Sequence, residues 1–318
     1  MRKRRKKATI GIAKEKAAGG MELRPSILPK EVKKVVEAGY PVFVEKGLGK
    51  GIYIDDDEYR KAGAKIISKR KDIFNKDVVV KLKPPLSEEF RMLKDNLLFC
   101  MLHAEQNPQF LTALKRSGSK AIAMELITNS AGERLIKCSH MAGEQGMIMA
   151  FHQAKKIPSD CRVLVLGYGD IASGAIKVAY SLGADVKILR KCEYRYMRHF
   201  LRNKDILVNG IKWPKEKRES RDYLVTRKML PLINRGGVIL DLSVDYPNPI
   251  ETCHPTMLNK PDYVVDGIRH ISIFGYPGLA PISSARIYSR QILTILLRIA
   301  GNHIDRFPRY LKNALIIP

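Results

Sequence analysis

Short apolar runs alternate with helical patterns along this 318-residue chain. Runs rich in valine, isoleucine and leucine are typical of buried strands, whereas apolar residues three and four positions apart are typical of helices. In residues 29–38, for example, Val32, Val35 and Val36 share one helical face, and Gly39 ends the helix. The predicted strands are 9–13, 41–44, 64–67, 77–82, 97–102, 121–125, 163–166, 185–189, 206–208, 238–242 and 263–265, and the predicted helices are 29–38, 108–115, 142–155, 171–182 and 283–300.

Alternation of strands with helices predicts an α/β fold with mostly parallel, doubly wound sheets. The chain is long enough for two domains, each with its own core, so we expect two such sheets, with the strands 206–208, 238–242 and 263–265 in the second. Nothing repeats at a fixed period, and low-complexity sequence is confined to the basic residues 1–7, which we expect to form a disordered tail.

Composition narrows the classes of protein that this chain can belong to. No apolar stretch approaches the ~20 residues that span a bilayer, and residues 8–13 are too short for a signal-peptide core. The five cysteines are scattered without Cys-x-x-Cys spacing, which argues against a disulfide framework and a zinc site. We therefore expect a cytoplasmic protein with no membrane partner and no metal.

The net charge of +25 is the unusual feature of the composition. It is compatible with an attraction to polyanions, with an anionic cofactor and substrate, or with a general bias in surface residues. No helix-turn-helix, zinc finger or aromatic–basic stacking motif accompanies the charge. We expect no specific nucleic-acid recognition, although nonspecific binding at low salt is expected for so basic a protein.

The most informative motif is an apolar strand, from Val163, that leads into Gly167-Tyr-Gly-Asp-Ile-Ala172. Gly167 permits a tight turn, Gly169 lets the backbone approach phosphates, and Ala172 allows close packing of helix on strand. The helix that follows presents free N–H groups and a partial positive charge at its N-terminus. The motif predicts a dinucleotide site, and its candidate residues are Gly167, Gly169, Asp170, Ile171 and Ala172.

Arg190 and Lys191 follow the next strand, at the position where an acidic residue normally binds the ribose 2′-hydroxyl of NAD. Two cations suit a 2′-phosphate, so the sequence favours NADP(H). NAD(H) stays open, because both residues are also compatible with solvated surface charges.

Polar residues at the carboxyl ends of strands are the next candidates, because ligands of open α/β sheets bind there. Lys83 and His103 each end a predicted strand, and Asp245 follows 238–242. A carbonyl that accepts hydride develops negative charge, and imine formation needs several proton transfers, so a lysine–histidine pair suits this chemistry. Arg24, in the loop after the first strand, has a guanidinium that can bind both oxygens of a carboxylate.

Each of these residues also has a structural interpretation. A loop lysine or arginine is often only solvated, a histidine after an apolar strand is often hydrogen-bonded in place, and Asp245 before Tyr-Pro-Asn-Pro is compatible with a turn.

At these residues the chain resembles the alanine dehydrogenase and transhydrogenase N-terminal family. Residues 10–15 with 23–29 are similar to the family's opening strand and carboxylate-binding arginine, 80–84 to its substrate-binding lysine motif, 101–107 to its catalytic histidine motif, and 241–245 to the strand whose last aspartate lies near substrate and nicotinamide. The resemblance implies His103, Lys83 and Asp245 as catalytic residues and Arg24, Lys83 and Glu125 as substrate-binding residues.

Within that family, the chain length and several motifs resemble the carboxyethylornithine synthase branch; the motifs are 54–60, 103–107, 141–144, 167–174, 209–213, 250–252 and 263–267. This resemblance implies an opine-type dehydrogenase, which condenses pyruvate with the side-chain amine of ornithine or lysine and uses NADPH as the reductant. Two alternatives stay open: reductive amination of pyruvate with ammonia, and a non-catalytic nucleotide-binding subunit like that of transhydrogenase.

The family also implies an architecture. Residues 139–279 form a Rossmann NAD(P)-binding domain, inserted into a substrate domain made of 8–138 and 280–318. By the same analogy we expect the protein to form a homo-oligomer and to bind two small molecules, a keto acid and an amino acid.

Overall fold

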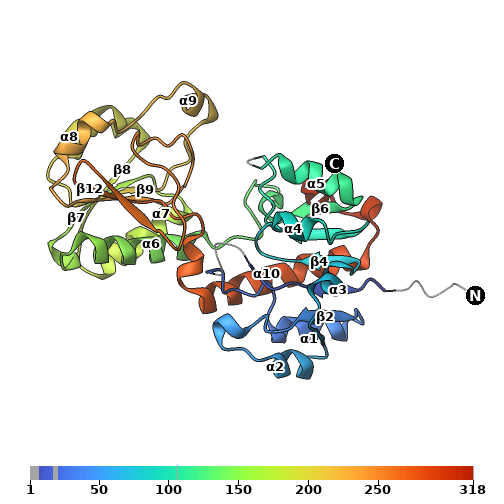
Figure 1. Ribbon diagram of the computed structural model, residues 1–318. Coiled ribbons are helices and arrows are strands. Elements are labelled where there is room, and N and C mark those ends of the chain that lie inside the picture. The colour runs from blue at the N-terminus through green and yellow to red at the C-terminus, as the bar shows by residue number, and fades with distance from the viewer. Residues whose placement is uncertain (1–6, 17–20, 106, 318) are drawn as a thin grey trace, which may run out of the picture. The chain divides into compact units, whose positions relative to one another are not determined.

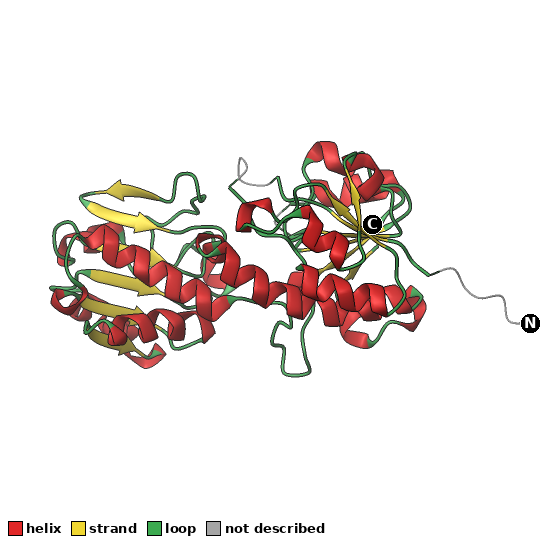
Figure 2. Ribbon diagram, turned by 90° about the horizontal axis from the view of Figure 1, so that it is seen from below, coloured by secondary structure: helices red, strands yellow, loops and turns green. Residues whose placement is uncertain are grey.

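The computed structural model describes residues 7–16, 21–105 and 107–317, so the predicted tail 1–7 lies almost entirely outside the described residues. The chain forms two compact units: the first combines Met1–Lys137 with Pro281–Pro318, and the second is Cys138–Ala280 (Figure 1). Both units have a mostly parallel sheet, and Figure 2 shows helices packed against each sheet. The predicted fold class is confirmed.

The first unit has a seven-stranded sheet in the order β13-β6-β5-β4-β1-β2-β3. All neighbouring strands in it are parallel except β13, which runs antiparallel to β6. The strands are β1 (Ile10–Ile12), β2 (Val42–Glu45), β3 (Lys65–Ile67), β4 (Val78–Val80), β5 (Leu97–Cys100), β6 (Lys120–Ala123) and β13 (Leu315–Ile316), and the helices are α1 (Pro29–Glu37), α2 (Asp56–Lys61), α3 (Arg70–Phe74), α4 (Ser87–Phe90), α5 (Gln109–Ser117), α10 (Pro281–Gly301) and α11 (Arg309–Lys312).

The strand order of the first unit reverses between β1 and β4. From β1 the chain passes to β2 and β3 on one side, and then crosses over to β4, β5 and β6 on the other. The three valines of β4 are fully buried, as expected for a central strand covered on both faces. A reversal of this kind opens a crevice at the carboxyl ends of the two strands, and ligands of α/β sheets bind in such crevices.

The second unit has a six-stranded sheet in the order β11-β12-β10-β9-β7-β8, and its order reverses between β7 and β9. The strands are β7 (Arg162–Leu166), β8 (Asp185–Leu189), β9 (Ile206–Asn209), β10 (Val238–Asp241), β11 (Asp262–Val265) and β12 (Ile268–Ile271), and the helices are α6 (Ser139–Ala154), α7 (Asp170–Ser181), α8 (Met197–Phe200) and α9 (Lys215–Glu219).

Helices α6 and α7 pack with almost no space between their backbones. A Cβ on Gly143 would lie 1.9 Å from the carbonyl oxygen of Ile171, and a Cβ on Gly174 would lie 1.9 Å from that of His140. Glycine at both positions therefore lets α7 rest directly on α6, which fixes the helix that follows the Gly167 turn.

One strand prediction is wrong in its pairing. Residues 263–265 belong to β11, which is antiparallel to β12 and forms a hairpin at the sheet edge instead of continuing the parallel sheet. The hairpin turn is Asp266-Gly267, with φ of 50° and 79°. This dipeptide between two apolar runs is a strong hairpin signal, and it was the available clue to β12. Strands β12 and β13 were not predicted.

No helix among residues 7–16, 21–105 and 107–317 is both long enough and apolar enough to cross a bilayer.

Candidate active site

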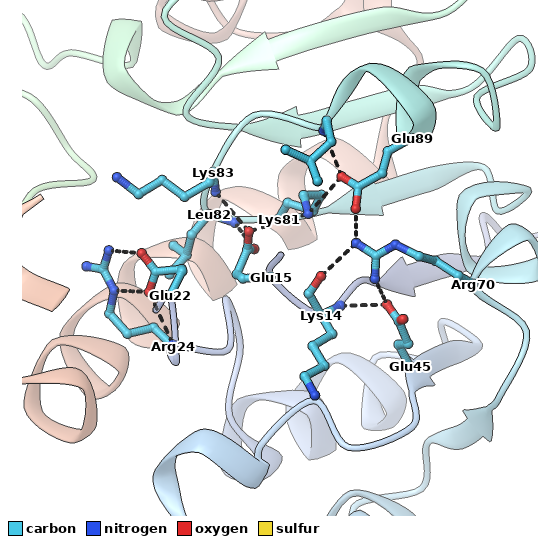
Figure 3. Close-up of polar contacts among 11 residues, drawn as sticks. Lys14, Glu15, Glu22, Arg24, Glu45, Arg70, Lys81, Leu82, Lys83 and Glu89 are labelled. Carbon is cyan, nitrogen blue, oxygen red and sulfur yellow. Dashed lines mark hydrogen bonds and ion pairs between the residues drawn. The ribbon is translucent and has the colours of Figure 1, made fainter. Parts of the chain in front are cut away.

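The end of β4 carries Lys81, Leu82 and Lys83, and a buried carboxylate holds this segment. Glu15, which follows β1, accepts the Leu82 N–H at 2.7 Å and the Lys83 N–H at 3.4 Å (Figure 3). The neighbouring strand ends β1 and β4 are thus joined at the point where the sheet order reverses. Lys83 follows the end of β4 at this point of reversal, and the sequence predicted it at a strand end.

The Lys83 amine lies in a strongly perturbed environment. Burial lowers its pKa below the ordinary value for lysine, and the positive charge of Arg24 lowers it further, while Glu22 and Glu15 oppose the change. These causes show that Lys83, Arg24, Glu22 and Glu15 are electrostatic neighbours. Such a cluster of perturbed groups at the end of strands is typical of a functional site.

Arg24 is buried, with 3% of its surface exposed, and it is paired with Glu22. Its Nε donates to Glu22 Oε1 at 2.6 Å and its Nη2 donates to Oε2, so the pair is bidentate. Burial alone would lower the pKa of Arg24, but the pairing with Glu22 holds the pKa above its ordinary value. Because Glu22 occupies the Nε side of the guanidinium, a substrate carboxylate would meet the opposite edge.

His103 follows β5 in a left-handed backbone conformation, with φ of 49°. Glu125 stabilises this conformation, because its Oε1 accepts the His103 N–H at 2.6 Å and its Oε2 accepts the Leu102 N–H at 3.0 Å. Burial lowers the pKa of His103, with further lowering from Lys83 and Arg134, while Glu125 opposes it. The neutral imidazole is thus favoured near pH 7.

Glu125 was predicted to bind substrate, and the structure places it at the end of β6 with both carboxylate oxygens on the backbone beside His103. These contacts support a positioning role, and substrate binding by Glu125 stays a prediction.

Sequence reasoning assigned no role to Glu15 or Glu22. The available signals were an acidic residue that ends the 10–15 motif and another directly before the 23–29 motif that contains Arg24.

The Gly167 turn of the second unit joins β7 to α7 as predicted. Gly167 has φ of 84°, and a Cβ there would lie 2.5 Å from Ile211. Ala172 is fully buried and packs against Gly210, so only a small residue fits. At Gly169 an added Cβ would meet nothing within 4 Å, which leaves the backbone open to a ligand. Asp170 and Ile171 begin α7 directly after the turn.

A pocket of about 580 Å³ lies beside this turn, at the carboxyl ends of β7, β8 and β9. A pocket of this size suits a small-molecule ligand or part of a cofactor. Both predicted cations are in its lining, and Arg190 extends to solvent with 83% of its side chain exposed. The lining includes Gly167, Tyr168, Arg190, Lys191, Trp213 and Lys217.

These features fit a dinucleotide cofactor. The open backbone at Gly169 and the N–H groups at the start of α7 suit a pyrophosphate, and the aromatic Tyr168 and Trp213 suit a base. The residues that would hold it are the predicted set, extended by the Trp213 loop, which the sequence analysis did not single out for this role.

Asp245 follows β10 in the second unit and is tied to the Trp213 loop. Its Oδ2 accepts the Trp213 N–H at 3.0 Å, and its Oδ1 lies 3.8 Å from Arg218 Nη1. Val244, just before it, has φ of 55°, which is rare for a β-branched residue. The structure thus places Asp245 at a strand end, in the unit that carries the pocket, while Lys83, Arg24 and His103 belong to the first unit.

Across residues 7–16, 21–105 and 107–317, no three histidine, cysteine, aspartate or glutamate side chains are grouped as a metal site would require.

Comparisons with known proteins give a consistent result. Residues 11–144 match the model of the alanine dehydrogenase/PNT N-terminal domain, and residues 190–316 match that of the C-terminal domain of the same family. Alanine dehydrogenase 1 of Staphylococcus aureus is 28% identical over 93% of this chain and 89% of its own length.

Two solved structures share the fold. An L-alanine dehydrogenase superposes with a TM-score of 0.83 at 24% identity, covering 96% of this chain and 94% of the other. A transhydrogenase from Sinorhizobium meliloti superposes with a TM-score of 0.77 at 24% identity, covering 91% and 93%. The two domain models span most of the sequence in the order that the fold requires, so this chain belongs to the alanine dehydrogenase/PNT family, a family of oxidoreductases with a Rossmann-type nucleotide-binding domain.

Proposed function

We propose that this chain is an NADPH-dependent oxidoreductase that forms an amino-acid C–N bond from a 2-keto acid and an amine. Residues 8–138 with 280–318 bind the substrates, and residues 139–279 bind the nucleotide. The observation that carries the proposal is the grouping of Lys83, Arg24 and His103 at the carboxyl ends of strands in the first unit. Nucleotide binding alone would require none of these residues.

The roles follow from charge and protonation. Arg24 and Lys83 hold the carboxylate of the keto acid or polarise its carbonyl, because the guanidinium and the amine are electrostatic neighbours. His103, whose lowered pKa favours the neutral form, accepts and returns protons as the amine adds and water leaves. Asp245 supports the amine chemistry, and Glu125 supports substrate binding. When bound, the nicotinamide cofactor supplies the hydride that reduces the C=N bond.

The amine that we propose is the side-chain amine of ornithine or lysine, and the keto acid is pyruvate. In this reaction the amine nitrogen bonds to the keto carbon, and water leaves with the keto oxygen and two hydrogens of the amine. A hydride on that carbon and a proton on the nitrogen complete a secondary amine. The motifs of the carboxyethylornithine synthase branch support this choice. An opine-type product would distinguish this chain from a simple amino-acid dehydrogenase.

Ammonia is the alternative amine, and the relatives named alanine dehydrogenase favour it. The other alternative is a nucleotide-binding subunit that does not turn over keto acids, and the transhydrogenase of similar fold favours it. Pyruvate and NADPH are therefore supplied with ornithine, lysine or ammonium, and the nicotinamide absorbance is followed while products are identified by mass. If ammonium is the only amine that supports turnover, the opine-type proposal is contradicted. If no pair of keto acid and amine supports turnover, the proposal that this chain is an enzyme is contradicted.

The preference for NADP(H) rests on Arg190 and Lys191 at the rim of the pocket. We expect NADPH to be used at least about tenfold more efficiently than NADH, and replacement of both residues by alanine to remove the preference through weaker NADPH binding. Efficiency with NADH serves as the internal control, since NADH lacks the 2′-phosphate. A clear preference of the unaltered protein for NADH contradicts the proposal.

By analogy with the family, we further propose a cytoplasmic homo-oligomer. Size-exclusion chromatography with light scattering measures the assembly, and a monomer at micromolar concentration contradicts it.

A further inference from the structure

Behind Lys83, in the first unit, lies a buried chain of charged side chains that the reaction outlined above does not use. Lys81 lies between two glutamates: its Nζ is 3.4 Å from Glu15 Oε2 and 3.2 Å from Glu89 Oε2. At most 1% of each of these three side chains is exposed. Figure 3 shows Lys81 and Lys83 leaving the strand end in opposite directions, with Glu15 between them.

Arg70 extends this chain to two more segments. It forms ion pairs with Glu89 and with Glu45, and its Nη2 donates to the Lys14 carbonyl at 2.8 Å. The Lys14 N–H in turn donates to Glu45 Oε2 at 2.8 Å. The network therefore ties the ends of β1, β2 and β4 to the first turns of α3 and α4.

The charges in this network do not balance. Three carboxylates, from Glu15, Glu45 and Glu89, face two cations, from Lys81 and Arg70. Burial raises the pKa of Glu15 and the nearby Glu22 carboxylate raises it further, while Lys81 and the N–H groups of Leu82 and Lys83 oppose that rise. A surplus of negative charge is costly inside a protein unless a cation lies nearby.

Lys83 is such a cation. The charged groups that act on it include Arg24, Glu22 and Glu15, and Lys83 itself acts on His103. Glu22 is already paired with Arg24 through both of its oxygens. Glu15 thus combines two effects on Lys83: it accepts the backbone N–H of that residue and it offsets the positive charge of Arg24.

We propose that Glu15 is the positioning residue for Lys83: its carboxylate, backed by Lys81, fixes the end of β4 and keeps the Lys83 amine cationic at the substrate site. The effect of Glu15 on catalysis rests on the proposed function, since a cationic Lys83 matters where a keto acid binds. The contacts of Glu15 with Lys81, Leu82 and Lys83 are independent of that function.

The direct test measures the titration of Lys83 without any turnover. The protein is labelled with acetic anhydride over a range of pH, and the acetylation of the Lys83 peptide is quantified by mass spectrometry. In Glu15→Gln one negative charge is lost, burial and Arg24 act with less opposition, and the Lys83 titration moves to lower pH by about one pH unit.

Glu45→Gln is the matched control, because it removes a carboxylate from the far end of the same network and leaves the Lys83 backbone contact intact. We expect its Lys83 titration to coincide with that of the unaltered protein, while its thermal stability falls. Identical titrations in Glu15→Gln and the unaltered protein, or equal shifts in both variants, overturn the proposal.

Glu15→Asp keeps the negative charge, but its shorter side chain no longer reaches the Leu82 and Lys83 N–H groups. This variant is the second test if Glu15→Gln does not fold. We expect an unchanged Lys83 titration with a KM for pyruvate raised about tenfold, and a Kd for NADPH that is unaltered because the pocket belongs to the other unit. An unchanged KM contradicts the positioning role. If no variant or parent turns over pyruvate but the Lys83 titration shifts, the proposed function fails and the role of Glu15 stands.

Discussion

His103 is the residue on which the proposed proton transfers depend, and its backbone is held in a conformation that non-glycine residues rarely adopt. The left-handed region costs an L-residue roughly 1–2 kcal/mol, so other contacts must impose it. Here the two N–H bonds to Glu125 do so. Strained backbone of this kind is concentrated at functional sites, which adds a geometric argument to the choice of His103.

Replacement of His103 by alanine is expected to reduce kcat about 100-fold or more, because a positioned general acid–base group contributes on that scale. Affinity for NADPH should not change, since the nucleotide pocket is in the other unit. His303→Ala is the control, because His303 is an exposed histidine of the same unit. Steady-state kinetics with pyruvate and the identified amine measure the effect, and turnover equal to the parent would remove His103 from the mechanism.

Gly169 allows cofactor binding to be separated from stability. Its φ of −78° suits any residue, and an added Cβ would meet nothing within 4 Å. We therefore expect Gly169→Ala to keep its unfolding temperature while NADPH binding weakens about tenfold or more, because the methyl group occupies the approach of the pyrophosphate.

Gly174→Ala is the contrasting variant, since its Cβ would lie 1.9 Å from the His140 carbonyl oxygen. It should lose on the order of 3 kcal/mol of stability through overpacking of α6 on α7. Fluorescence titration with NADPH and thermal unfolding distinguish the two variants. Normal NADPH affinity in folded Gly169→Ala would show that the turn does not hold the pyrophosphate.

At the scale of elements, the β11–β12 hairpin carries a histidine that makes stability depend on pH. His270 is fully buried, its Nδ1 lies 3.0 Å from the Ile268 carbonyl oxygen, and its Nε2 lies 2.7 Å from the Thr252 hydroxyl. These contacts suit a neutral ring that donates from Nδ1 and accepts at Nε2. Burial lowers the pKa of His270 to about 4, compared with an ordinary value of 6.5.

The unfolded chain, where this pKa is ordinary, takes up the proton first as pH falls. Stability is therefore lost between pH 6.5 and about 4, and the shift corresponds to about 3 kcal/mol. We expect urea unfolding of the parent to lose about that much more stability over this range than His270→Gln, which has no such group. His152→Gln, which alters an exposed histidine of the same unit, should follow the parent. Parallel losses in the parent and His270→Gln would contradict the assignment.

At the scale of the whole molecule, the charge of +25 is expected to cause weak, sequence-independent binding to polyanions. Binding to double-stranded DNA at 50 mM salt should fall roughly 1,000-fold or more by 200 mM salt, because counterion release drives it. Deletion of residues 1–7, which carry six of the 57 lysines and arginines, should weaken it only in part. Fluorescence anisotropy over a salt series measures this, and tight salt-resistant binding that the deletion abolishes would favour a nucleic-acid function.

The local sequence determined much of this protein. The apolar runs predicted eleven strands within a few residues of their observed positions, because burial on both faces of a parallel strand leaves a clear continuous pattern. Gly167, Gly169 and Ala172 predicted the turn between β7 and α7, since only small residues allow that backbone and that packing. Lys83, His103 and Asp245 were selected as candidate site residues because α/β sheets bind ligands at strand ends.

Tertiary structure decided what depends on partners distant in sequence. The antiparallel pairing of β11 with β12 and the addition of β13 to β6 are choices between strand edges, which periodicity does not encode. The same holds for the site: Glu15 reaches Leu82 and Lys83, and Glu125 reaches His103, across intervals that no local pattern records. A motif specifies the residue that a strand presents at its end, but only packing of the whole sheet brings together the buried carboxylates that set its position and its charge.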